Sequence, residues 1–219
     1  GVDYAALSNY FLATIVQVGF ICVFMIGIER VGFLIRPEAY QILVGGFFAF
    51  MSLRSRVFSS LDASRPRPEG EWEVKRPSWT PPRMAFPVIW SSIAVLRTVS
   101  SVLIWEAGGR QMLTAPLIAM VTHLSIGDTW NCITNVEKRR GTSLAGMPFV
   151  WGSVVTVVVI YYLTLPLAGL VLAPSALWIS IASALIFSIW KLNGEESLLP
   201  LKLPELPEKP QEPKEEAKA

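Results

Sequence analysis

Six long apolar stretches restrict the fold of this chain more than any other feature. They cover residues 10–28, 39–53, 84–105, 113–135, 147–165 and 174–192. The hydrocarbon core of a bilayer is about 30 Å thick and takes roughly 20 helical residues to cross. Only 16% of the residues are charged, against about 25% in a typical soluble domain. Transmembrane strands would show apolar and polar residues in alternation over about ten positions, and these blocks are apolar throughout. The sequence therefore predicts an all-α membrane protein with six transmembrane helices.

Basic residues predict how these helices are oriented. Seven lysines and arginines lie in the connection 54–83, three lie at 138–140, and five lie from Lys191 to Lys218. If all six stretches cross the membrane, these residues share one side, and the opposite side has only Arg30, Arg36 and Arg110. The positive-inside tendency then predicts both termini on the cytosolic, stromal or matrix side. A plastid thylakoid or a mitochondrion would fit an N-terminus released by removal of a transit peptide.

Two segments outside the apolar stretches have their own composition. The tail from Leu199, "LPLKLPELPEKPQEPKEEAKA", is rich in proline and charge, which predicts an extended or disordered segment unless a partner orders it. The stretch "KRPSWTPPRMAFPVIW", residues 75–90, stands directly before an apolar run. Pro81 and Pro82 are typical of the start of a helix. Trp79 and Trp90 beside them are typical of anchors at the membrane interface.

The same stretch resembles a known family. "PSWTPP" followed by "VIW", then "IWEAGG" at 104–109 and "SALWISIASALIFSIWKLN" near the end, are similar to motifs of the TspO family, also called the translocator protein or peripheral benzodiazepine receptor family. The resemblance covers about residues 40 to 194. It implies a five-helix transmembrane bundle at 37–194, with 59–83 as an extramembrane connection. Residues 1–36 then form one additional N-terminal transmembrane helix, and 195–219 form the tail.

The resemblance also implies a site. TspO proteins are often dimeric and have a pocket inside the bundle for tetrapyrroles, or for sterols in animal members. The positions that match are Trp90, Trp130, Trp178 and Ala182. On a helix, Trp178, Ala182, Ile186 and Asn193 lie within about 80° of one another. That face could line a pocket or pack against a neighbouring helix.

Three positions depart from the family pattern. Ile186 and Gly127 stand where the family has asparagine, and Ala94 replaces an aromatic hydroxyl residue. Each change removes a polar group from the expected pocket, and a pocket that discriminates by hydrogen bonds loses specificity when such groups are lost. The chain is therefore expected to keep a vestigial or altered apolar pocket.

Ionisable residues inside the predicted helices are further candidates, because a charge in the hydrocarbon layer is costly. Arg97, His123 and Asp128 are expected to form an intramembrane polar cluster, with a paired Arg97 and Asp128 locking two helices. An alternative role for His123 is axial ligation of the metal of a bound tetrapyrrole, chlorophyll or haem, which neutral imidazole suits.

Other chemistry is absent from the sequence. There is no P-loop, Rossmann glycine pattern or nucleophile elbow, and a single histidine excludes a histidine-based metal cluster. The net charge of +2 does not favour nucleic acid, and Cys22 and Cys132 are expected to be small buried residues. The prediction is a non-enzyme: an accessory or scaffold subunit of a larger, pigment-containing membrane complex. The alternative is a stand-alone tetrapyrrole- or lipid-binding receptor or a transporter.

Overall fold

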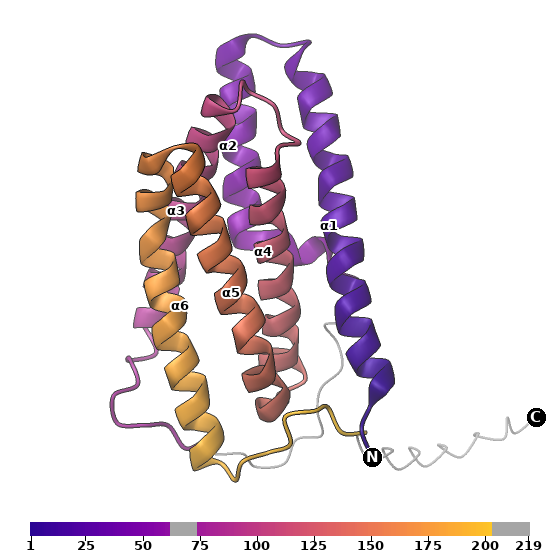
Figure 1. Cartoon of the computed structure of the whole chain (residues 1–219), viewed down its shortest axis with the longest axis vertical. Coiled ribbons are helices and arrows are strands. Elements are labelled where there is room, and N and C mark those ends of the chain that lie inside the picture. The colour runs from indigo at the N-terminus through magenta and orange to yellow at the C-terminus, as the bar shows by residue number, and fades with distance from the viewer. Residues whose placement is uncertain (62–73, 203–219) are drawn as a thin grey trace, which may run out of the picture.

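The chain is a bundle of long helices in a computed structural model that describes residues 1–61 and 74–202. The long helices are α1 (Tyr4–Gly32), α2 (Pro37–Arg54), α3 (Ala85–Ala107), α4 (Ala115–Asn131), α5 (Arg140–Thr164) and α6 (Pro166–Leu192) (Figure 1). A 3₁₀ turn, η1 (Ser55–Phe58), follows α2, and a π-helical turn, η2 (Cys132–Val136), follows α4. Within the described ranges the only β pairing is an isolated bridge between Val2 and Leu201. The predicted all-α class is confirmed.

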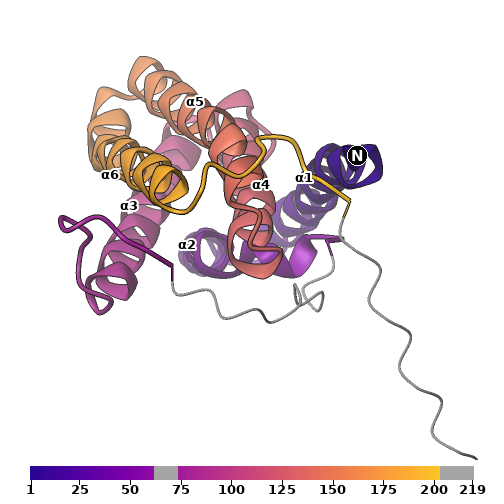
Figure 2. The same ribbon diagram turned by 90° about the horizontal axis from the view of Figure 1, so that it is seen from below.

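The helices alternate in direction, so the N-terminus and the last described residues lie at the same end of the bundle (Figure 1). Around the bundle the order is α1, α2, α3, α6, α5, α4, and each helix packs against its neighbours in that order. The end view shows the same arrangement, with α1 on one flank and α6 on the other (Figure 2). The additional N-terminal helix thus stands between α2 and α4.

Four helices are long and apolar enough to cross a bilayer: α1, α3, α5 and α6. This fits a multi-pass integral membrane protein. α2 has 18 residues and α4 has 17, and neither is among the four helices found in the described residues. The π-helical turn η2 continues α4 without a break, however, and keeps the chain helical from 115 to 136. Helices lie at all six predicted positions, and six complete crossings remain a prediction.

Several predicted helix starts were wrong. α5 begins at Arg140 rather than at 147, and α6 begins at Pro166 rather than at 174, so Pro148 and Pro174 lie inside helices. Neighbouring helices allow such interior prolines in membrane bundles. Pro81 and Pro82 precede α3, and the first-turn proline of that helix is Pro87.

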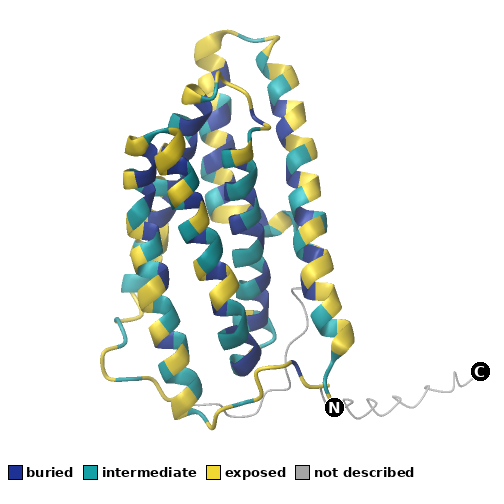
Figure 3. Ribbon diagram, viewed as in Figure 1, coloured by how far each residue is buried: buried dark blue, intermediate teal, exposed yellow. Residues whose placement is uncertain are grey.

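The additional helix α1 belongs to the core of the bundle. Its buried residues Ile21, Met25 and Ile28 join a cluster with side chains from α2, α3, α4, α5 and α6. The largest fully buried side chain in this cluster is Trp105, whose ring contacts Tyr40 edge-on at a centroid distance of 4.9 Å. The outer faces of the helices are exposed and apolar, as lipid contact requires (Figure 3). Removing α1 would therefore uncover apolar surface that now packs inside the protein.

The segment after α6 runs beneath the bundle to the N-terminus. Trp190 Nε1 donates to the carbonyl of Glu196 at 2.6 Å, and Asp3 N donates to the carbonyl of Pro200 at 2.7 Å. A Cβ on Gly141 would lie 2.0 Å from the carbonyl oxygen of Ser197, so glycine allows this close approach. Residues 200–202 are thus bonded to the chain's own N-terminus. Residues 203–219, and most of the insert at 59–74, lie outside the described residues.

Candidate functional site

Two adjoining cavities lie between the helices. The outer cavity has a volume of about 560 Å³ and lies near the end of the bundle that holds the N-terminus and the end of α6 (Figure 1). The inner cavity, about 370 Å³, lies deeper in the bundle. Both are lined by Trp90, Trp130, Asn131 and Ala182, which form the boundary between them. All eight predicted site residues line one or both cavities.

Tryptophans from three helices line the outer cavity. Trp90 comes from α3, Trp130 from α4 and Trp178 from α6, beside Ala182 and Ile186. Trp178 contacts Phe86 edge-on at 6.2 Å between centroids. The helix spacing correctly placed Trp178, Ala182 and Ile186 on one face.

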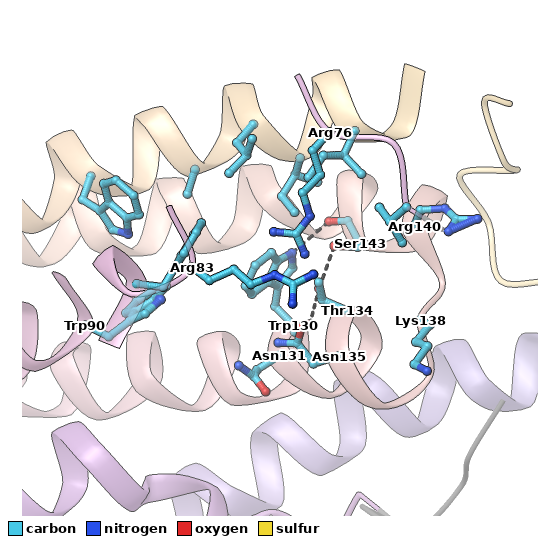
Figure 4. A pocket seen from close by; sticks show the side chains of 17 residues that line it. Arg76, Arg83, Trp90, Trp130, Asn131, Thr134, Asn135, Lys138, Arg140 and Ser143 are labelled. Carbon is cyan, nitrogen blue, oxygen red and sulfur yellow. Dashed lines mark hydrogen bonds between the residues drawn. The ribbon is translucent and has the colours of Figure 1, made fainter. Parts of the chain in front are cut away.

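Trp130 is held by α5. Its Nε1 donates to the carbonyl of Ser143 at 3.0 Å. The hydroxyls of Thr134 and Ser143 share a hydrogen bond of 2.6 Å beside it (Figure 4). A Cβ on Gly146 would lie 3.2 Å from Trp130 Cδ1, so the absence of a side chain there leaves room for the indole. These contacts fix the plane of Trp130 at the base of the outer cavity.

Asn193 does not line the cavity, although it shares the predicted face of α6. Its side-chain amide bonds to the backbone of Lys75 in both directions, accepting from Lys75 N at 3.0 Å and donating to Lys75 O at 2.9 Å. Asn193 therefore attaches the connection before α3 to the end of α6.

Arg97, His123, Gly127 and Asp128 line the inner cavity. Arg97 and Asp128 do not form the predicted ion pair within the described residues. One guanidinium nitrogen of Arg97 lies 2.8 Å from His123 Nε2, and His123 Nδ1 lies 2.8 Å from Ser153 Oγ. Arg97 on α3 thus contacts His123 on α4. Asp128, on the same helix as His123, bonds to other side chains.

Asp128 connects the additional helix to the site. Its Oδ2 accepts from Gln17 Nε2 at 2.7 Å and from Ser55 Oγ at 2.5 Å. Gln17 also donates to the carbonyl of Ser55 at 3.0 Å. Nearby, Thr14 and Thr129 share a hydrogen bond of 2.7 Å. Sequence reasoning missed this network, and the signal for it was a lone glutamine within the first apolar stretch.

His123 does not fit axial ligation of a metal in this arrangement. Arginine has only donors, so Nε2 must use its lone pair to accept from Arg97. Nδ1 then carries the proton and donates to Ser153. Neither ring nitrogen has a lone pair left for a metal unless Arg97 moves away. The described residues contain no group of three or more histidine, cysteine, aspartate or glutamate side chains placed to hold a metal. Cys22 and Cys132 form no disulfide with each other; Cys132 is buried, as expected, and Cys22 is only partly buried.

Basic side chains surround the outer cavity, and sequence reasoning treated them only as an orientation signal. The connection before α3 contributes Arg76 and Arg83, the turn between η2 and α5 contributes Lys138, and α5 begins with Arg140 (Figure 4). The proximity of Arg76 and Arg83 to Trp79 and Trp90 in sequence was the available clue. The cavity thus combines an aromatic interior with a cationic rim.

The sequence of this chain is similar to those of known proteins. The model of the TspO/MBR family matches residues 47–191, which leaves α1 outside the matched range. Protein CrtK of Rhodobacter capsulatus is 29% identical over 135 residues, covering 60% of this chain and 84% of that protein. The human Translocator protein is 26% identical over 122 residues, covering 55% of this chain and 72% of that protein. Translocator protein 2 of Mus musculus is 27% identical over 165 residues, covering 74% and 99%.

Proposed function

Because this chain belongs to the TspO/MBR family, we propose that it is a membrane-embedded binding protein for a flat apolar ligand of the tetrapyrrole class. The observation that carries the proposal is the convergence of Trp90, Trp130 and Trp178 on one cavity. Indole faces stack well on flat conjugated rings. A volume of about 560 Å³ lies within the roughly 300–1,000 Å³ of ordinary ligand pockets.

The proposed binding mode is stacking between tryptophans without a protein ligand to any metal at the ring centre. A bound tetrapyrrole would supply light absorption or redox chemistry. The chain itself would hold the ring and keep bulk water from it. Members of this family are generally binding or transport proteins, and we propose no catalytic role.

An accessory or scaffold role in a larger, pigment-containing membrane complex is the second candidate. The apolar Ile186, Gly127 and Ala94 support it, because they replace polar groups expected in a family pocket. Arg97, Asn131 and Asp128, however, supply other polar groups to the inner cavity. Gln17 Nε2 of α1 donates to Asp128 and Ser55 within the chain, so α1 has an intramolecular role that needs no partner subunit. The binding role is therefore the better supported of the two. In either role we propose that both termini face the cytosol, stroma or matrix.

Titration with a metal-free porphyrin in mild detergent tests the proposal, with the Soret absorption band as the readout. Replacing Trp178 by leucine should weaken binding at least tenfold, because stacking surface is lost. Trp151→Leu is the matched control, since Trp151 is exposed on the outer face and lines neither cavity. Equal affinities in the two variants would reject the binding role. A wild-type chain that binds nothing alone but co-migrates with a large assembly from native membranes would favour the subunit role.

A further inference from the structure

Two opposite charges line the inner cavity, and each belongs to a different hydrogen-bond network. Arg97 of α3 lies 2.8 Å from Nε2 of His123. Asp128, five residues after His123 on α4, accepts instead from Gln17 and from Ser55. Arg97 and Asp128 both line the cavity, yet the ion pairs among the described residues do not include one between them. A guanidinium and a carboxylate thus face one cavity without joining.

This division leaves Arg97 with the weaker of its two available acceptors. A carboxylate attracts a guanidinium by its charge, which a neutral imidazole cannot do, and the attraction grows in a low-dielectric interior. Nε of Arg97 is buried and has no hydrogen-bond partner in the described part of the chain, and such a buried donor costs free energy. Asp128 is only about 7.5 Å beyond His123 along the helix axis. The two opposite charges would therefore pair unless the structure held them apart.

Gln17 supplies that restraint from the side of α1. Its Nε2 donates to Asp128 Oδ2 at 2.7 Å and to the carbonyl of Ser55 at 3.0 Å. Because an ionised carboxylate and a carbonyl only accept, both N–H groups of the amide are committed to these bonds. Gln17 is fully buried, and it lies outside residues 47–191, which match the family model. The carboxylate is thus held by a helix that the family match does not include.

From these contacts we propose that Gln17 is a positioning residue of the inner cavity. It holds Asp128 so that Arg97 bonds to His123, and without its amide Arg97 moves to Asp128. The imidazole then loses its donor at Nε2. One residue of α1 therefore decides whether a ligand that reaches the inner cavity meets an occupied or a free ring nitrogen. The inference goes beyond the proposed function and does not depend on what the outer cavity binds.

One other cation could take the place of Arg97. The charge of Arg56, in η1, also acts on Asp128. One guanidinium nitrogen of Arg56 donates to Asn131 at 3.3 Å, and a second is buried without a partner among the described residues. If Arg56 compensated Asp128 after the loss of Gln17, His123 would keep its donor. The protonation of His123 therefore distinguishes the two cations.

Nuclear magnetic resonance of His123 tests the proposal, because the chain contains a single histidine. Protein labelled with ¹⁵N-histidine, purified by a tag without histidine and placed in lipid bilayers, gives one pair of ring-nitrogen signals. Wild type should carry the proton on Nδ1. Gln17→Met keeps the length of the side chain and removes the amide. The ratio of the Nδ1–H to the Nε2–H form should then fall roughly tenfold, because Nε2 loses a charged donor.

The matched control is Gln41→Met, which removes an exposed glutamine bond to Glu106 of α3 and should leave both signals unchanged. The double variant Gln17→Met, Asp128→Asn separates positioning from a general loosening of α1. Asparagine has no charge to draw Arg97 away, so the wild-type signals should return although α1 still lacks its amide.

Two results with Gln17→Met would overturn the proposal: unchanged signals, or altered signals that persist in the double variant. Should Gln17→Met not fold, Ser55→Ala removes the other donor to Asp128 Oδ2 and should shift the ratio in the same direction. Unchanged signals in that variant would reject the proposal as well. A wild-type spectrum with the proton on Nε2 of His123 would reject it at the outset, because Arg97 could not then donate there.

Discussion

One guanidinium nitrogen of Arg97 lies 2.8 Å from Nε2 of His123, and both side chains are buried between the helices. Because arginine only donates, the contact fixes the histidine as the neutral tautomer protonated at Nδ1, which donates to Ser153. The three side chains come from α3, α4 and α5, so the contact joins three helices. Both ring nitrogens of His123 are thus satisfied by side chains of neighbouring helices.

Axial ligation can be checked by spectroscopy. If His123 Nε2 stays with Arg97, a metalloporphyrin added to wild type and to His123→Gln should give the same Soret and visible bands. Glutamine keeps an acceptor for Arg97, so the variant should still fold. A band shift between the two proteins would show that the imidazole reaches the metal and that Arg97 has moved aside.

The docking of α1 depends on Gln17, which is fully buried and bonded to both Asp128 and Ser55. Replacing it by leucine should lower the free energy of unfolding by about 1–3 kcal/mol, since the carboxylate of Asp128 loses a buried donor. Thermal unfolding in detergent, followed by tryptophan fluorescence, measures the change. Gln41→Leu removes an exposed bond to Glu106 and should cost less than about 0.5 kcal/mol. A similar loss in both variants would mean that the bond to Asp128 contributes nothing specific.

The positions of the helices could be predicted because solid apolar stretches have few alternatives in a bilayer. The faces of α6 could also be predicted, since Trp178, Ala182 and Ile186 follow from the helix period alone. The starts of α5 and α6 could not. Pro148 and Pro174 resembled breaks, and only packing against neighbouring helices allows them inside a helix.

The hydrogen-bond partners of side chains on different helices could not be predicted from the sequence. Rise per residue gives the depth of Arg97, His123 and Asp128, but it does not give the rotation of each helix about its axis. Arg97 bonds to His123, while Gln17 on α1 and Ser55 hold Asp128, so the predicted Arg97–Asp128 pair does not form. The basic rim was missed for a related reason, because Arg76 and Lys138 lie 62 positions apart in sequence and meet only through the fold.

The affinity of the outer cavity for a porphyrin should depend on the size of the side chain at position 146. A side chain on Gly146 meets Trp130 Cδ1, and Trp130 cannot turn freely while its Nε1 bonds to Ser143. Gly146→Val should therefore push the indole into the cavity and weaken porphyrin binding several-fold. Gly152→Val, on the same helix with nothing within 4 Å of its Cβ, should leave the affinity unchanged. Unchanged binding in both variants would mean that Trp130 does not touch the ligand.

Asp3 should make stability depend on pH at the end of α1. Its Oδ1 accepts from Ala6 N at 3.0 Å, and its Oδ2 lies 3.3 Å from Arg139. The backbone hydrogen bond from Ala6, and then Arg139, hold the pKa of Asp3 below its ordinary value of 3.8. A carboxylate with a depressed pKa stabilises the fold above the unfolded value, and this stability is lost as pH falls through the folded pKa. The loss should therefore come below about pH 4.

The substitution that isolates this effect is Asp3→Asn, because asparagine caps a helix about as well as aspartate but does not titrate here. Thermal unfolding at pH 6 and pH 3 should show a larger fall in Tm for wild type than for the variant, since only wild type loses a charged cap and its contact with Arg139. Asp3→Ala should cost about 1 kcal/mol already at pH 6, where the cap is intact in wild type. Equal falls in wild type and Asp3→Asn would assign the acid sensitivity to other carboxylates.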